Sequence, residues 1–277
     1  MNLIKVDGAE LSSLALGDAH APPLAMLHGL VSGNMASWYS SIATPLAERR
    51  RVLLYDQRGH GGSSVPASGF DLDSQACDLH AVLAHYGQHQ PVDLVGHSMG
   101  ALIALRFALR WPQRVRRLAL VDAPMPARQH VAPSLRGLVS RQALADYIDV
   151  HLAATGLKGR RRERLHQRLA ALFFESTLLR DVLAMDGEPD AALAALDLPV
   201  LLLYGERSPC VEAGRHLLHA LPRARLQLLD GGHYLPEENP AALRKHLQDF
   251  LSVAPAEEAR HTPVPGLAAL FPAAQTI

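Results

Sequence analysis

The sequence Gly-X-Ser-X-Gly at residues 96–100 contains the strongest candidate for a nucleophile, Ser98. An apolar run at residues 92–95 comes directly before it, and an apolar stretch of helical period begins directly after it at Ala101. A serine between a strand and a helix in this pattern stands on a tight, strained turn that exposes its hydroxyl. The first N–H groups of the helix, including that of Met99, point to the same place and could stabilise an oxyanion. We therefore predict that Ser98 attacks a carbonyl carbon.

A serine hydroxyl is a poor nucleophile without an adjacent base, and His233 is the candidate for that base. The chain has 15 histidines, so the choice depends on position. His233 follows Gly231 and Gly232 in the loop after the last apolar run, residues 226–229. This loop opens at the same edge of the predicted sheet as Ser98, and its glycines free the backbone there. We predict that His233 accepts the serine proton.

A second oxyanion donor is predicted from the sequence His28-Gly29-Leu30, which follows the apolar run at residues 24–27. The backbone N–H of Leu30 is well placed for this role. We interpret His28 itself as a structural residue, because a neutral imidazole readily satisfies a buried loop by hydrogen bonds. The same interpretation applies to His60 and His97.

The elements that must position these residues form an α/β pattern, in which short apolar runs alternate with segments of helical period. This pattern predicts a mostly parallel sheet with helices on both faces. An antiparallel edge hairpin is expected around Asp7-Gly8, a dipeptide that suits a turn with positive φ. A last helix is expected to begin at Asn239 and Pro240. The predicted strands of the main sheet are residues 24–27, 52–55, 92–95, 118–121, 200–204 and 226–229.

The segment between Asp122 and Pro199 has no strand pattern and is far longer than an ordinary connection. Apolar residues recur there at helical spacing after Ser140, which predicts a helical insertion. An insertion at the carboxyl ends of the strands would cover the ligand site of an open α/β sheet, with Phe173 or Phe174 lining the cavity. The predicted organisation is a core of residues 1–124 and 197–252, a helical cap of residues 125–196, and a Pro/Ala-rich tail of residues 253–277.

Composition narrows the class of partner. Lys plus Arg and Asp plus Glu number 27 each, so no global field favours nucleic acid or an anionic membrane surface. The two cysteines, Cys77 and Cys210, match no metal-ligand or redox spacing. The N-terminus has no apolar signal region, and no apolar run approaches the length of a membrane span. We expect a cytoplasmic protein that binds a small molecule with an apolar acyl part.

Four motifs together resemble the α/β-hydrolase family, particularly enol-lactone hydrolases, small-molecule esterases and thioesterases. They are His28-Gly29, residues 56–63 (DQRGHGGS), residues 96–100 and Gly232-His233, and the resemblance extends over about residues 20–252 outside the insertion. The resemblance implies an α/β-hydrolase fold and a Ser-acid-His triad, with no cofactor and no metal. A serine nucleophile also disfavours the branches of the family that attack with a carboxylate.

The acid of the triad is the one departure from the family's pattern. The resemblance places it three residues after Gly205, where this sequence has Ser208, and serine cannot stabilise an imidazolium as a carboxylate does. Asp122 is our preferred acid, because it closes the preceding predicted strand, as in some branches of the family. Glu206 is the alternative.

The predicted reaction is hydrolysis of a carboxylic ester, lactone or thioester through an acyl-Ser98 intermediate. Two alternatives remain open: a C–C hydrolase or cyclase acting on a polyketide-like chain, and a non-catalytic ligand-binding homologue, which the serine at position 208 would permit. The basic run at residues 158–164 is interpreted as a solvated helix face. It could instead dock the phosphate of an acyl carrier protein or of coenzyme A, which would favour a thioesterase.

Overall fold

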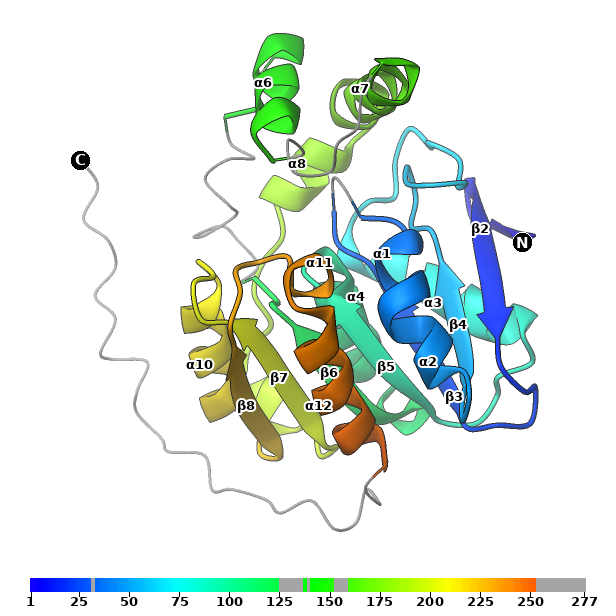
Figure 1. The fold of residues 1–277 in the computed structure, drawn as a ribbon, viewed down its shortest axis with the longest axis vertical. Helices are drawn as coiled ribbons and strands as arrows, with labels where there is room; N and C mark the ends of the chain where they lie inside the picture. Colours follow the sequence, from blue (N-terminus) through cyan, green and yellow to red (C-terminus); the bar gives the residue numbers. More distant parts are fainter. Residues whose placement is uncertain (31–32, 125–136, 139, 152–158, 253–277) are drawn as a thin grey trace.

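The computed structural model describes residues 1–30, 33–124, 137–138, 140–151 and 159–252. An eight-stranded sheet in the order β1-β2-β4-β3-β5-β6-β7-β8 runs through the molecule (Figure 1). The six strands β4, β3, β5, β6, β7 and β8 pair in parallel. The first two strands are antiparallel: β1 to β2, and β2 to β4. The strands are β1 (Asn2–Val6), β2 (Ala9–Leu16), β3 (Pro23–Leu27), β4 (Arg51–Tyr55), β5 (Val92–His97), β6 (Val115–Val121), β7 (Val200–Gly205) and β8 (Ala224–Leu229).

Helices cover both faces of the parallel sheet, and most side chains of its inner strands are therefore apolar and buried. In β4, Leu53 packs into one core and Leu54 into the other, because successive side chains point to opposite faces. The first core lies under α3 (Leu72–His85), α4 (Met99–Arg110) and α10 (Val211–Ala220). The second lies under α1 (Ala36–Trp38), η1 (Tyr39–Ala43), α2 (Thr44–Leu46), α11 (Leu235–Glu238) and α12 (Pro240–Ser252). A short η2 (Pro112–Arg114) leads into β6.

The edge hairpin predicted from Asp7-Gly8 is confirmed. Asn2 pairs with Ser13 and Val6 with Ala9 in an antiparallel register. Gly8 has a φ of 71°, a value that a side chain disfavours. Together with the mostly parallel sheet and the helices on both of its faces, this hairpin gives the α/β-hydrolase architecture expected from the sequence.

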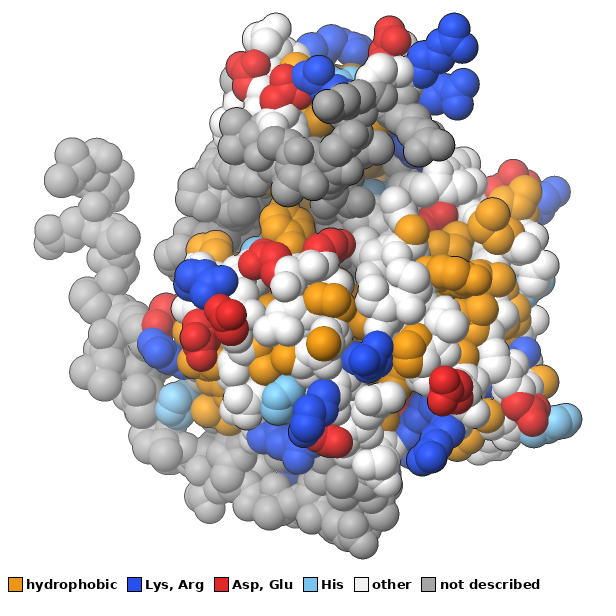
Figure 2. Space-filling view, in the orientation of Figure 1, with side chains coloured by type: hydrophobic (Ala, Val, Ile, Leu, Met, Phe, Trp, Pro, Cys, Tyr) orange, Lys and Arg blue, Asp and Glu red, His pale blue; other side chains and the backbone are white. Residues whose placement is uncertain are grey.

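In the described part of the segment predicted as a helical insertion, between β6 and β7, the helices are α6 (Arg141–His151), α7 (Gly159–Phe174), α8 (Leu178–Leu183) and α9 (Asp190–Ala194). Figure 1 shows α6, α7 and α8 beyond one end of the sheet. Figure 2 shows Lys and Arg side chains, with some Asp and Glu, at the outer end of this insertion. Ser140 accepts a hydrogen bond from the Ala143 N–H at 3.1 Å and so caps α6, at the residue that the sequence analysis chose as the helix start.

The insertion contacts the loop that follows β4. The Arg168 guanidinium on α7 donates to the carbonyl of Gly59 at 2.9 Å, and the Thr177 N–H donates to the carbonyl of Ala67 at 2.9 Å. Both contacts lie on the side of the carboxyl ends of the strands. The boundaries of the predicted cap and its place over Ser98 remain predictions, and the tail at residues 253–277 lies outside the described residues.

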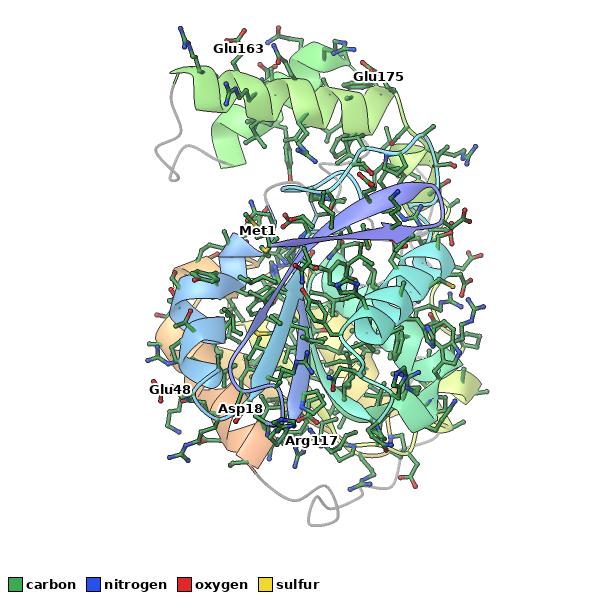
Figure 3. All side chains as sticks on the ribbon, turned by 90° about the vertical axis from the view of Figure 1, so that its right-hand side faces the viewer. Met1, Asp18, Glu48, Arg117, Glu163 and Glu175 are labelled. Atoms are coloured by element: carbon green, nitrogen blue, oxygen red, sulfur yellow. The ribbon has the colours of Figure 1, made fainter. Side chains whose placement is uncertain are left out.

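A buried cluster of charged side chains lies at the opposite end of the sheet. Figure 3 labels one of its members, Arg117, far from Glu163 and Glu175 of the insertion. Asp93 is fully buried and accepts from Arg116 at 2.8 and 2.9 Å and from Arg117 at 3.3 Å, with Arg50 as a further partner. Arg117 also donates to the carbonyl of Leu251 at 3.2 Å. The cluster thus joins β5 and β6 to the end of α12.

Among the described helices, none combines the length and the apolar character that a bilayer span requires.

Candidate active site

Ser98 occupies the sharp turn between β5 and α4, with φ 53° and ψ −119°. A non-glycine residue rarely adopts a positive φ, and holding it there costs on the order of 1–3 kcal/mol, which the surrounding structure must supply. The turn requires its two glycines: a Cβ on Gly96 would lie 2.2 Å from the carbonyl oxygen of Gly100, and one on Gly100 would lie 2.4 Å from that of His28. The strand-turn-helix context predicted for Ser98 is present, although α4 begins at Met99 rather than Ala101.

The sheet places Ser98 and Asp122 by neighbouring hydrogen bonds. The Ser98 N–H donates to the carbonyl of Val121 at 2.9 Å, and the Asp122 N–H donates to the carbonyl of Leu203 at 2.7 Å. Both residues come directly after a strand, and both have a positive φ, 53° and 47°. Because of this positive φ, the side chains of Ser98 and Asp122 do not continue the alternating directions of the side chains along their strands.

His233 is within hydrogen-bond distance of Ser98. Its Nε2 lies 2.9 Å from the Ser98 Oγ, so the hydroxyl can donate to the ring. The loop of His233 is held by His97, whose Nε2 donates to the carbonyl oxygen of His233 at 2.7 Å. Burial lowers the pKa of His97 to about 3, so this ring is neutral and acts as a fixed donor. His97 is therefore structural, as the sequence analysis proposed.

Asp122 contacts the other nitrogen of the same ring. The His233 Nδ1–H donates to Asp122 Oδ2 at 2.6 Å, and the Asp122 side chain is fully buried. Two more donors reach the carboxylate, the Gly205 N–H on Oδ1 at 3.0 Å and the Ser208 hydroxyl on Oδ2 at 2.5 Å. Three donors fix the orientation of this buried carboxylate.

The electrostatics of His233 follow from this pairing. Burial by itself lowers the pKa of His233, but the hydrogen bond and charge of Asp122 outweigh it, with Cys210 adding to them, and the pKa is raised. Because Nδ1 donates to Asp122, the neutral ring has Nε2 free to accept a proton from Ser98. The arrangement can carry a proton between Ser98 and the ring.

The two candidate acids have different surroundings. Asp122 meets His233, whereas Glu206 is an exposed residue after β7 whose backbone N–H donates to the carbonyl of Leu229 at 2.8 Å. Ser208, which the sequence analysis treated only as a departure from the family's pattern, contacts Asp122 itself. Its part in the site was missed because the two residues are far apart in sequence and are brought together only by the pairing of β6 with β7, the strands that they follow.

The loop after β3 runs close to Ser98. A Cβ on Gly29 would lie 3.2 Å from the Cβ of Ser98. Leu30 is the next residue of this loop. His28 holds this loop: its Nδ1 donates to the carbonyl of Gly29 at 2.8 Å, and its Nε2 accepts from the Gln57 N–H at 2.9 Å. Burial lowers the pKa of His28 to about 4, which supports its structural role. The oxyanion donors Leu30 and Met99 remain predictions.

The remaining motif, residues 56–63, is held by hydrogen bonds of its own side chains. Asp56 accepts from the N–H groups of Met35 at 2.8 Å and Gly62 at 2.7 Å. His60 is buried, its Nδ1 donates to the carbonyl of Arg58 at 2.8 Å, and burial lowers its pKa to about 3. These residues shape the loop beneath α7 and are not within the Ser98–His233–Asp122 arrangement.

Comparison with known proteins gives a consistent result. The model of the alpha/beta hydrolase fold family matches residues 22–159. The pimeloyl-[acyl-carrier protein] methyl ester esterase of Chromobacterium violaceum is 34% identical over 251 residues, which cover 83% of this chain and 91% of that protein. The putative carbamate hydrolase RutD of Pseudomonas savastanoi pv. phaseolicola is 31% identical, covering 84% of this chain and 95% of that one. The enol-lactonase of Burkholderia xenovorans LB400 has a similar fold, with a TM-score of 0.73 at 21% identity, over 91% of this chain and 100% of that one.

Proposed function

This chain belongs to the α/β-hydrolase family, and we propose that it hydrolyses a carboxylic ester, lactone or thioester through an acyl-Ser98 intermediate. Its relatives include hydrolases named for ester and carbamate bonds. The observation that carries the proposal is the continuous contact from Ser98 Oγ to His233 Nε2 at 2.9 Å and from His233 Nδ1 to Asp122 Oδ2 at 2.6 Å. Such a relay activates a hydroxyl that would otherwise be a poor nucleophile.

In the proposed reaction, the Ser98 Oγ attacks the carbonyl carbon while its proton passes to His233 Nε2. The carbonyl oxygen becomes an oxyanion, which the backbone N–H groups of Leu30 and Met99 would stabilise. The bond to the leaving oxygen or sulfur then breaks, and His233 returns the proton to that atom. Water repeats the sequence on the acyl-serine, and Asp122 stabilises the imidazolium in both halves.

The same contacts favour an enzyme over a non-catalytic ligand-binding homologue. Ser208 cannot replace an acid, but it donates to Asp122, the residue after β6, whose carboxylate contacts His233 and would supply the charge. The test is hydrolysis of a chromogenic short-chain ester, together with labelling by an organophosphonate and mass analysis of the modified peptide. We expect labelling at Ser98 and a loss of about 10⁴ to 10⁶ in kcat for Ser98→Ala. Labelling elsewhere, with activity retained in Ser98→Ala, would refute the proposal.

We further propose that residues 125–196 form a cap that shapes the acyl pocket. The support is that Leu169, Leu172 and Phe173 on α7 are buried, and that α7 is tied to the loop after β4 through Arg168. An apolar cap over the carboxyl edge of the sheet would favour a substrate with an apolar acyl part. Replacing Phe173 by Ala should change the preference between short and long acyl chains more than it changes the rate on acetate esters.

A second candidate narrows the substrate to one that carries an acyl carrier protein or coenzyme A. Two observations favour it: a relative is named for an acyl-carrier-protein substrate, and Arg160, Arg162 and Arg164 are exposed on the first half of α7. Clustered guanidinium groups bind phosphate well. Replacing the three arginines by Ala should raise KM for an acyl-carrier-linked ester and leave KM for a free ester unchanged. Arg141→Ala, at an exposed arginine on α6, is the matched control.

A further inference from the structure

Three potential metal ligands, Asp122, Cys210 and His233, come together on the Nδ1 side of the His233 ring, away from Ser98. The Cys210 Sγ lies 3.7 Å from His233 Nδ1, and Asp122 Oδ2 lies 2.6 Å from the same nitrogen. All three ligand atoms lie within 4.8 Å of one another. Cys210 is held in place because its backbone N–H donates to the Ser208 Oγ at 3.0 Å. Thiolate, imidazole and carboxylate are the side-chain groups that bind zinc in proteins.

We propose that Asp122, Cys210 and His233 form an inhibitory site for Zn²⁺. A tetrahedral ion with Zn–N of about 2.05 Å and Zn–S of about 2.3 Å separates those two ligand atoms by about 3.6 Å. The observed distance between His233 Nδ1 and Cys210 Sγ is 3.7 Å. The corresponding N···O separation is about 3.4 Å, so the Asp122 oxygen must withdraw by less than about 1 Å from its contact with the ring.

The charges of the site also suit a divalent cation. Asp122 is fully buried, and the Cys210 thiol is partly exposed, which leaves the ion a way in. A thiolate and a carboxylate together neutralise the two charges of Zn²⁺, so no net charge is buried. The thiol must lose its proton on binding, and zinc affinity should therefore rise with pH. The fourth ligand position is left for water.

Zinc at this site would block the reaction by fixing the tautomer of His233. A metal ion on Nδ1 leaves the proton of the neutral ring on Nε2, the nitrogen 2.9 Å from the Ser98 hydroxyl. That nitrogen can then no longer accept the serine proton. This consequence rests on the proposed role of His233 as base, whereas zinc binding itself does not. Because the ion lies on the far side of the ring from Ser98, kcat should fall while KM stays unchanged.

Binding is tested separately from catalysis, in the full-length Ser98→Ala variant with Co²⁺ as a spectroscopic probe. We expect the near-ultraviolet sulfur-to-cobalt band to appear and to be abolished by adding Cys210→Ser. Cys77→Ser is the matched control, because Cys77 is an exposed free thiol away from the site. Removing even an outer partner of a metal ligand costs about 10–100-fold in affinity, so loss of Cys210 should cost at least that. A band that persists in Cys210→Ser, or that never appears, would overturn the site.

Inhibition is then measured by Zn²⁺ titration of ester hydrolysis in the wild type, Cys210→Ser and Cys77→Ser, each relative to its own rate without metal. The proposal predicts loss of kcat in the wild type and in Cys77→Ser, and an inhibition constant at least about 10-fold weaker in Cys210→Ser. Equal inhibition of all three proteins would refute the site. Cobalt binding through Cys210 without any loss of kcat would keep the metal site and refute the role of His233 as base.

Discussion

Asp122→Asn is the most informative substitution in the site, because it removes a charge and keeps the shape. The Asp122 carboxylate accepts from the Gly205 N–H, the Ser208 hydroxyl and the His233 Nδ1–H. A hydroxyl can change from donor to acceptor, but a backbone N–H cannot. The amide oxygen of Asn must therefore face Gly205, since the opposite orientation would set two donors against each other at a cost of about 1–3 kcal/mol.

With the amide oxygen on Gly205, the NH₂ group faces His233, and Nδ1 must accept instead of donate. The ring proton then lies on Nε2, facing Ser98, which is the wrong tautomer for a base. In a serine protease, the same substitution lowers kcat by about 10⁴, and we expect a similar loss here. At about 1.36 kcal/mol for each factor of ten, this is about 5 kcal/mol of lost transition-state stabilisation.

The assay is steady-state hydrolysis of a chromogenic ester by the wild type, Asp122→Asn and Glu206→Gln. The matched control is Glu206→Gln, because Glu206 is an exposed carboxylate after the neighbouring strand. The kcat of this variant should stay within about twofold of the wild type. Circular dichroism and thermal unfolding would show that both variants are folded. A folded Asp122→Asn that keeps more than about a tenth of kcat, or a large loss in Glu206→Gln, would refute the reasoning.

Three further predictions follow from the same contacts. Ser208→Ala removes a donor to a buried carboxylate, a bond worth about 1.5–3 kcal/mol, so kcat should fall by about 10- to 100-fold with KM unchanged; an unchanged kcat would mean that this bond does not orient Asp122. Since Asp122 raises the pKa of His233, kcat/KM should increase with pH through an apparent pKa above 6.5, and a limb at or below 6.5 would contradict it. Asp93→Asn leaves the buried Arg117 and the partly buried Arg116 without this carboxylate and should lower the free energy of unfolding in urea by about 3–5 kcal/mol, whereas the exposed Asp249→Asn should leave it nearly unchanged.

The sheet could be predicted from the sequence because its strands are buried on both faces and leave continuous apolar runs. Each predicted strand of the parallel sheet is observed, with ends that differ by up to three residues, as for β6, which begins at Val115. The short helical segments α1, η1 and α2 were not predicted. They pack through Trp38 and Ile42, whose burial comes from tertiary contacts rather than from a long apolar period.

The positions of the candidate site residues were predictable where one motif places one residue, as for Ser98, or where a loop follows a strand, as for His233. The neighbours of Asp122 were not predictable in this way. After β7, Ser208 contacts Asp122 and Cys210 contacts His233, and the spacing between Cys77 and Cys210 in sequence says nothing about these contacts. Such partners depend on which strands lie side by side, and this order appears only in the folded chain.

The neighbouring hydrogen bonds that place Ser98 and Asp122 have a consequence for how the protein would lose activity on heating. Both residues are anchored in the interior of the sheet, which is the last part of such a protein to open. His233 is carried by a loop, which is held by the bond from His97 to its carbonyl oxygen and by Glu238, which accepts from the N–H groups of Gly232 and Tyr234. Local opening of this one loop would separate the His233 ring from Ser98 and Asp122, which stay in place. Heat inactivation should therefore be reversible at first and should precede the melting of the sheet.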